Sequence, residues 1–135
     1  MIPTPVEVAD SLSAYNAQTD KWHSAVWHFF YQLESSKYAP INFSATGGVN
    51  VVSGTAGKKI LIYSLFFTVG GATEVTLKDG NNNISGPMDF GDTSEPRGIV
   101  VPLTILPIEL GSGNSFVISI SSSVQVSGMV IYRLV

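Results

Sequence analysis

The sequence has no cysteine, few charged residues and no apolar stretch long enough to cross a membrane. The absence of cysteine excludes disulfides, thiol catalysis and thiolate metal sites. Charged residues make up 13% of the 135 residues, compared with roughly 25% in typical soluble domains. The longest apolar run, Ile60–Val69, has the length of a strand, whereas a membrane helix needs about 18–20 residues. This composition predicts a soluble chain that buries apolar surface in an oligomer and does not bind a membrane.

Positive charge is also sparse, because Lys58 and Lys59 are the only adjacent basic residues and the net charge is −3. Nucleic-acid grooves need clustered positive charge, so we expect no nucleic-acid partner. The first ten residues, MIPTPVEVAD, lack the basic and apolar regions of a secretory signal. We therefore expect synthesis in a cytoplasm.

Residues 1–40 differ in character from the rest of the chain. Pro3 and Pro5 favour an extended arm at the start. Across residues 8–35 a heptad seam recurs at alternating spacings of four and three, without glycine or proline, which predicts an amphipathic helix. Pro40 and the polar residues before it are expected to end this helix. The seam positions are Val8, Leu12, Tyr15, Thr19, Trp22, Val26, Phe29 and Leu33.

Two interpretations of this helix remain open. It either packs on the β-domain of its own chain or associates with copies of itself, and a third possibility is an irregular arm. The aromatic seam residues Tyr15, Trp22 and Phe29 suit the wide space between three or more helices. We predict that residues 1–40 serve anchoring and oligomerisation. The expected interface residues are Leu12, Tyr15, Trp22, Val26, Phe29 and Leu33.

From about Asn42 the apolar period becomes two, which is typical of strands. Strands are predicted at 49–53, 57–69, 73–78, 84–88, 98–103, 116–121 and 124–135, the last broken near Gly128. A hairpin loop is predicted at 79–83, and a crossing or edge segment at 104–110. Short strands separated by turns every 8–12 residues indicate a mainly β fold, a sandwich or barrel. Within this class we favour an eight-stranded, jelly-roll-like antiparallel sandwich over residues 41–135.

The strand predicted at 57–69 is apolar on both faces. A strand with one wet face alternates apolar and polar residues, so this one needs cover on both sides. We predict that the odd positions, with Leu61, Leu65 and Phe67, form the sandwich core. The even positions Ile60, Ile62 and Phe66 are then expected to meet a neighbouring copy or the N-terminal helix.

No group of residues predicts catalysis, a metal site or a cofactor. His23 and His28 are five residues apart, so on a helix they point in different directions. The segment 79–90 begins like a calcium loop but has Ile84 where glycine is required and Phe90 where the bidentate glutamate belongs. The acidic segment 89–97 is interpreted as a solvated loop rather than a glycosidase carboxylate pair. We predict that the protein is not an enzyme.

Several segments together resemble a β-module that is common in virion proteins of tailed bacteriophages. They are VNVVSGTAGKKILIYSLFFTV, TEVTLKDG, ISGPM, GIVVPL and VSGMVIYRLV, and they cover about residues 48–135. The region 106–110 departs from the pattern, which often has an aromatic residue there. The resemblance implies a jelly-roll-like fold that often trimerises and is displayed on the virion, as head decoration, fibre or tail component.

These observations predict a structural virion protein of a bacteriophage: a decoration, cement or head-fibre subunit that forms a homotrimer. Its expected partners are further copies of itself and the major capsid protein or another virion protein. Its expected location is the capsid surface, after assembly in the host cytoplasm. The alternative is a tail-fibre or receptor-binding module that contacts a host glycan or protein through the loops 81–83, 89–97 and 111–114.

Overall fold

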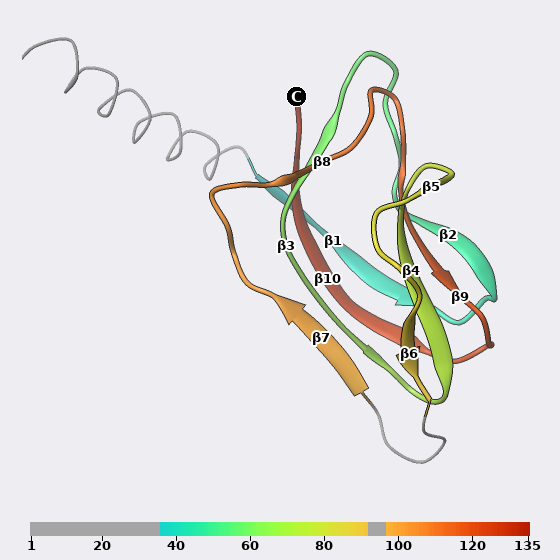
Figure 1. Ribbon diagram of the computed structural model, residues 1–135. Helices are drawn as coiled ribbons and strands as arrows, with labels where there is room; N and C mark the ends of the chain where they lie inside the picture. The colour runs from blue at the N-terminus through green and yellow to red at the C-terminus, as the bar shows by residue number, and fades with distance from the viewer. Residues whose placement is uncertain (1–35, 92–96) are drawn as a thin grey trace, which may run out of the picture. The chain divides into compact units, whose positions relative to one another are not determined.

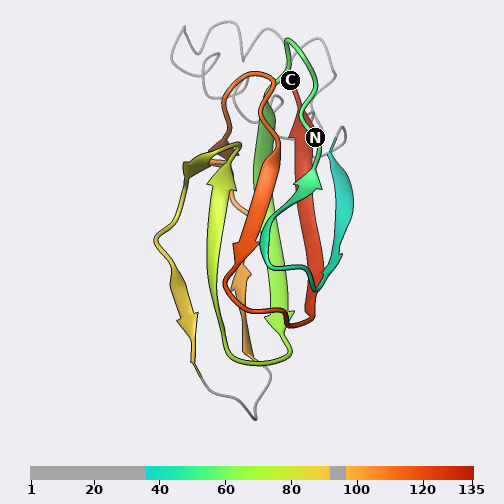
Figure 2. The same cartoon turned by 90° about the vertical axis from the view of Figure 1, so that its right-hand side faces the viewer.

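The structure, a computed structural model, describes residues 36–91 and 97–135, which form two antiparallel β-sheets packed as a sandwich (Figure 1). Sheet A has the strand order β1-β10-β3-β7, with β8 beside β3, and sheet B has the order β2-β9-β4-β5, with β6 beside β4. Figure 2 shows the chain from the side of sheet B. The strands are β1 (Lys37–Phe43), β2 (Gly47–Val52), β3 (Ile60–Val69), β4 (Thr73–Asp79), β5 (Asn82–Asn83), β6 (Met88–Phe90), β7 (Arg97–Val101), β8 (Ile108–Glu109), β9 (Phe116–Ile120) and β10 (Val126–Leu134).

The predicted β-sandwich is confirmed for the described residues, with two local corrections. The strand predicted at 84–88 is wrong: β5 ends at Asn83 and β6 begins at Met88, so Pro87 precedes a strand. The break predicted near Gly128 is also wrong, because β10 runs through that glycine without interruption. The amphipathic helix predicted over residues 8–35 lies outside the described residues.

The sheet begins earlier than the sequence predicts, because β1 contains Pro40 and crosses the expected boundary between residues 40 and 41. Ala39, Ile41 and Phe43 pack towards the core, while Tyr38 and Pro40 alternate with them on the other face. Among the described strands, β1 is an edge strand that pairs with β10 alone. Proline is tolerated there because an edge strand leaves half of its N–H groups outside the ladder. Pro40 therefore belongs to a strand and does not mark the end of a helix.

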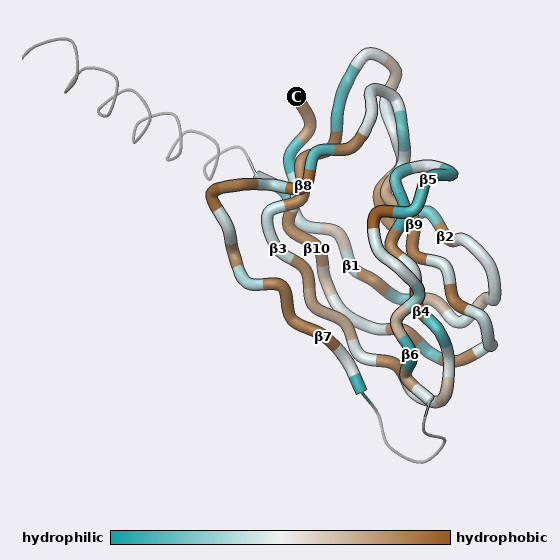
Figure 3. The backbone as a smooth tube through the Cα atoms, in the orientation of Figure 1, coloured by the Kyte–Doolittle hydropathy of each residue, from teal (hydrophilic) through white to brown (hydrophobic). Residues whose placement is uncertain are grey.

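The core lies between the two sheets and is almost entirely apolar. Both sheets contribute to it through alternate strand positions. Figure 3 shows hydrophobic residues, in brown, on strands of both sheets. Burial of these side chains is the main stabilising contribution to the fold. The largest fully buried side chains are Tyr63, Phe67, Phe116, Ile41, Ile60, Ile62, Leu65, Leu110, Ile118, Val69, Val75 and Val126.

The long strand β3 changes face partway along its length. Ile62 pairs with Tyr132 and Ser64 pairs with Ile131, so Tyr63 is an extra residue opposite no partner. Such a β-bulge shifts the alternation by one position. As a result Ile60 and Ile62 point into the core before the bulge, and Leu65, Phe67 and Val69 do so after it. The prediction that Ile60 and Ile62 lie on an outer face is therefore wrong.

At one end of the sandwich, the carboxylate of Asp79 connects two turns. One oxygen accepts a hydrogen bond from the Gly111 N–H at 2.9 Å, and the other accepts one from the Asn114 side-chain amide, also at 2.9 Å. Gly80 follows Asp79 with a φ of 58°, which glycine adopts at little cost. The hairpin predicted at 79–83 is confirmed, but its loop is shorter than predicted, because Asp79 ends β4 and pairs with Asn82 of β5. The Asp79 carboxylate therefore serves to hold the loops together.

Candidate functional site

The outer face of sheet A has an apolar row that crosses four strands. Pro40 pairs with Met129, Met129 with Phe66, and Phe66 with Val100, so these four residues lie side by side across the sheet. Directly opposed residues on neighbouring strands share a face and lie within contact distance. We call this surface the outer band. It consists of Tyr38, Pro40, Phe66, Val100, Met129 and Ile131.

A second row of the outer band lies one pleat away from the first. There Tyr38 pairs with Ile131, and Ile131 pairs with Ser64. The Ser64 hydroxyl donates a hydrogen bond to the Val101 carbonyl at 2.7 Å, so this polar group is satisfied within an apolar row. The outer band therefore runs from the β1 edge to the β7 edge without an unpaired hydroxyl at Ser64.

The band is exposed to an unusual degree for apolar side chains of this size. Tyr38 is 74% exposed, Val100 75% and Phe66 43%. Met129 and Ile131, between them, are half-buried. Apolar residues scattered singly on a surface need no explanation, whereas a contiguous apolar patch marks an interaction site.

Apolar exposure continues past β7 into residues 102–107, which we call the crossing segment. Its three large apolar side chains, Leu103, Ile105 and Leu106, are all exposed. Two hydrogen bonds fix its backbone: the Thr104 N–H donates to the Tyr63 carbonyl at 3.1 Å, and the Leu106 N–H donates to the Thr104 hydroxyl at 3.1 Å. Proline at both ends, positions 102 and 107, restricts it further. The crossing segment therefore presents its apolar side chains from a fixed backbone.

Polar groups border the outer band along both of its long sides. On one side Ser127 pairs with Asn42 and with Thr68, and the Gln125 amide donates to the Asn42 oxygen at 2.8 Å. On the other side Leu61 pairs with Arg133 and Glu109. An apolar centre with a polar margin is the usual organisation of a protein–protein interface.

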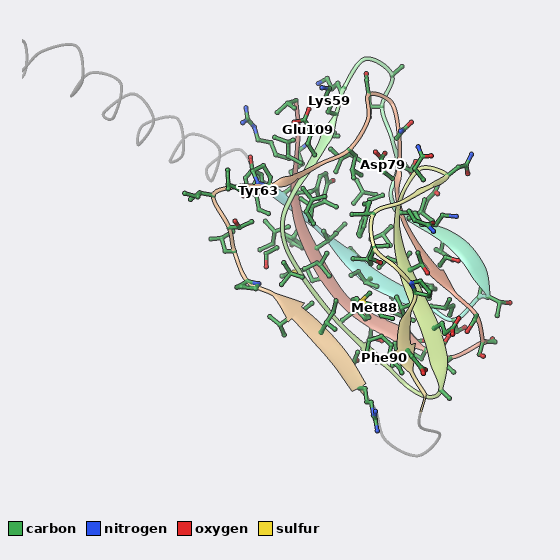
Figure 4. All side chains as sticks on the ribbon, in the orientation of Figure 1. Lys59, Tyr63, Asp79, Met88, Phe90 and Glu109 are labelled. Carbon is green, nitrogen blue, oxygen red and sulfur yellow. The ribbon has the colours of Figure 1, made fainter. Side chains whose placement is uncertain are left out.

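The polar margin near β8 includes an ion pair between Lys59 and Glu109, with 2.7 Å between Nζ and Oε1 (Figure 4). The hydrogen bond to Glu109 raises the pKa of Lys59 above its ordinary value of 10.5. The ion pair therefore stabilises the fold fully at pH values below 10.5, the ordinary pKa of lysine. This stabilisation is lost as the pH rises through the higher pKa that Lys59 has in the folded protein. Both side chains are about half exposed, so the contribution is small.

The outer face of sheet B is different, because polar residues dominate it. In β4 the core residues alternate with Glu74, Thr76 and Lys78. Ser119, on β9, pairs with Thr76. Asp89 pairs with Glu74 on the same sheet. A polar outer face of this kind is what a sheet in contact with water requires. Of the two outer faces, only that of sheet A therefore has the composition of an interface.

Tyr63, the extra residue of the bulge in β3, is 1% exposed. Among the side chains that the structure describes, its hydroxyl is the buried polar group without a hydrogen-bond partner. We expect Tyr63→Phe to raise the free energy of unfolding by about 1 kcal/mol, because an unpaired buried hydroxyl costs about 1–3 kcal/mol. Urea denaturation measures the change, with Tyr38→Phe, at an exposed position, as a control that leaves stability unaltered. A loss of stability in Tyr63→Phe would show that the hydroxyl has a partner.

The structure divides the predicted interface residues into three groups. Phe66 lies on the outer face, as predicted, whereas Ile60 and Ile62 lie in the core. The seam residues Leu12, Tyr15, Trp22, Val26, Phe29 and Leu33 lie outside the described residues.

Sequence reasoning missed Tyr38, Val100, Met129 and Ile131 as surface partners of Phe66. The alternation of Tyr38 and Pro40 with three core residues in β1 was a usable signal. For Val100 and Met129 the missing information was the strand register, which places both opposite Phe66. A sequence pattern shows which residues share a strand face but does not show which strands are neighbours.

No group of three or more histidine, aspartate or glutamate side chains that could hold a metal ion occurs within residues 36–91 and 97–135. The same part of the chain has no helix long and apolar enough to cross a membrane. His23, His28 and part of the acidic segment 89–97 lie outside the described residues. No protein-family model matches the chain, and no curated protein matches it significantly.

Proposed function

We propose that this chain is a structural subunit of a bacteriophage particle, a decoration, cement or head-fibre protein that assembles as a homotrimer on the capsid surface. The observation that carries the proposal is the outer band with its polar margin, a surface built for protein contact. The resemblance of residues 48–135 to phage virion modules supports the choice of particle. The major capsid protein is the proposed partner beyond the trimer itself.

The course of the chain supports a jelly-roll-like arrangement within the sandwich. The first four strands alternate between sheets A and B, and the chain crosses between the sheets again from β6 to β7, from β8 to β9 and from β9 to β10, whereas β4, β5 and β6 stay in sheet B and β7 and β8 stay in sheet A. Connections that pass from one sheet to the other are a property of jelly rolls. Within the described residues, the outer face of sheet B is polar and the outer face of sheet A carries the apolar outer band.

The energetic argument is that the outer band lowers the free energy of the assembled state. Each square ångström of apolar surface removed from water contributes roughly 25 cal/mol, before the costs of association are subtracted. A structural subunit repeated over a shell gains further because several attachments act together. A sandwich with one apolar outer face is therefore suited to a permanent place in an assembly.

Electron microscopy of particles labelled with a gold-conjugated antibody against the chain tests the proposed function. We expect gold over the head shell, and we expect purified chain to bind again to heads from which it has been removed. Gold confined to the tail tips would instead support the receptor-binding alternative. Particles that carry no label in any position would overturn the proposal that the chain is a virion protein.

A further inference from the structure

β7 forms one edge of sheet A and, among the described strands, pairs with β3 alone (Figure 1). The Val101 carbonyl accepts the hydrogen bond from the Ser64 hydroxyl of β3, so this carbonyl points towards β3. In an antiparallel ladder the N–H and C=O groups of one residue point to the same side, and successive residues alternate. The backbone groups of Gly98 and Val100 therefore point away from β3, and both residues are exposed.

The other edges of the two sheets carry features that oppose the addition of a strand. β1 contains Pro40, which has no N–H, and β2 has a bulge between Asn50 and Val52. β5, β6 and β8 have only two or three residues each. Proline, bulges and short length are the usual protections of an exposed edge. β7 has five residues without proline or a bulge, and its one charged residue, Arg97, stands at its beginning.

The side chains along β7 define what an added strand must carry. Ile99 and Val101 pack towards the core but remain half-buried, and Val100 lies on the opposite face beside Phe66. A strand beside β7 extends both faces, so it needs apolar residues on both of its own faces. It needs N–H groups on the side that meets β7, whereas those on its outer side are dispensable. The edge therefore fits an extended, uncharged segment with donors on one side.

Residues 2–6, Ile-Pro-Thr-Pro-Val, lie outside the described residues, and their sequence has this pattern. They include no charged side chain, and a residue that precedes proline favours extended backbone. The prolines, at positions 3 and 5, are two residues apart, so the missing N–H groups fall on one side of a strand. The other three residues keep their donors on the opposite side. Such a segment can pair with one edge while its outer side opposes any further strand.

We propose that residues 2–6 of one copy pair with the β7 edge of a neighbouring copy, so that exchanged arms link the copies. The number of copies, three, rests on the proposed function, whereas the pairing rests on the free edge of β7. In a closed assembly each copy donates one arm and accepts one, so every β7 edge is covered. Because only Gly98 and Val100 point outwards, the ladder is short. It adds to the contact at the outer band, and tethering within one assembly raises the effective concentration of the arm.

The absence of cysteine from the chain allows a test by cross-linking. Full-length Thr4→Cys with Val100→Cys is treated with a short bismaleimide reagent, and we expect covalent dimers and trimers on a denaturing gel. An equimolar mixture of the two single variants should give covalent dimers and no trimers. The matched pair Thr4→Cys with Thr76→Cys, whose second position lies on the outer face of sheet B, should not cross-link.

Sedimentation before treatment establishes that the variants assemble. Products confined to one chain would show that each copy pairs with its own arm. The absence of any product from assembled protein would show that the arm does not meet β7. Either result would overturn the exchange of arms between copies.

Hydrogen exchange of the full-length chain gives a second test that needs no cysteine variant. The amides of Gly98 and Val100 should exchange at least about tenfold faster in Thr4→Pro than in the parent, because this variant loses the central donor of the arm. Thr4→Ala keeps that donor and should match the parent. The Ile99 amide, which points towards β3, should be equally protected in all three. Equal exchange at Gly98 and Val100 in the parent and in Thr4→Pro would contradict the pairing.

The outcome is separable from that of the proposed function. If gold labels the head shell but the arm neither cross-links to β7 nor protects its amides, the inference fails and the proposed function stands. If the exchanged arms are found but no particle carries the label, the contact stands and the proposed function fails.

Discussion

Phe67→Ala is expected to lower the free energy of unfolding by about 3–5 kcal/mol, the usual cost of removing a buried aromatic side chain. Phe67 is 1% exposed and lies after the bulge of β3, where the odd positions face the core. Its ring packs edge-on against Phe90, with 6.1 Å between ring centroids and 66° between ring planes. Such an aromatic pair adds about 0.5–1.5 kcal/mol beyond the area it buries.

Because small domains are stable by only about 5–15 kcal/mol, this one substitution removes a large part of the total. Urea denaturation followed by circular dichroism measures the change in the midpoint. Thr68→Ala, the next position and an exposed one, is the matched control and should change stability by less than about 0.5 kcal/mol. Equal losses in the two variants would show that the bulge does not set the faces of β3 as described.

Gly128→Ala is the second large effect, and we expect a loss of about 3 kcal/mol or more because the site has no room for a methyl group. A Cβ atom at Gly128 would fall against the Phe66 carbonyl oxygen, and it would lie 2.7 Å from the Phe67 Cα. β10 pairs with β1 on one side and β3 on the other. β10 cannot shift to make room for the methyl group, because a shift would disturb its hydrogen-bond ladders with both β1 and β3.

Thermal unfolding of Gly128→Ala measures this effect, with Gly86→Ala as the control. A Cβ atom at Gly86 meets nothing within 4 Å, and its backbone is not left-handed. That variant should keep the stability of the parent, or gain slightly by losing backbone freedom in the unfolded chain. A Gly128→Ala variant as stable as the parent would contradict the close approach of β10 and β3.

The sequence predicted the sandwich because apolar alternation and turn residues are local signals. The bulge at Tyr63 shows where such signals end. The residues before and after it, Ile62 and Ser64, are apolar and small respectively, so nothing in the sequence pattern marks Tyr63 as the residue without a pairing partner. One extra residue reversed the predicted faces for Ile60 and Ile62, although the strand itself was correct.

The candidate site was predictable only in part, for a related reason. Phe66 could be placed on an outer face, but its neighbours Met129 and Val100 come from strands far away in the sequence. Their contact depends on strand order and register, which are set by the packing of the whole sandwich. Pro40 was interpreted as the end of a helix because proline is most often a helix breaker, yet an edge strand accommodates it equally well.

The central claim, that copies of the chain associate through the outer band, is tested most directly by sedimentation of the full-length variant Phe66→Asp. A carboxylate at the centre of the band would be buried without a partner in the assembled state, which is strongly unfavourable. We predict that dissociation of the trimer moves to at least a tenfold higher protein concentration, while Thr76→Asp on the outer face of sheet B sediments as the parent does. A parent chain that is monomeric at micromolar concentration, or a Phe66→Asp trimer as stable as the parent, would contradict the account.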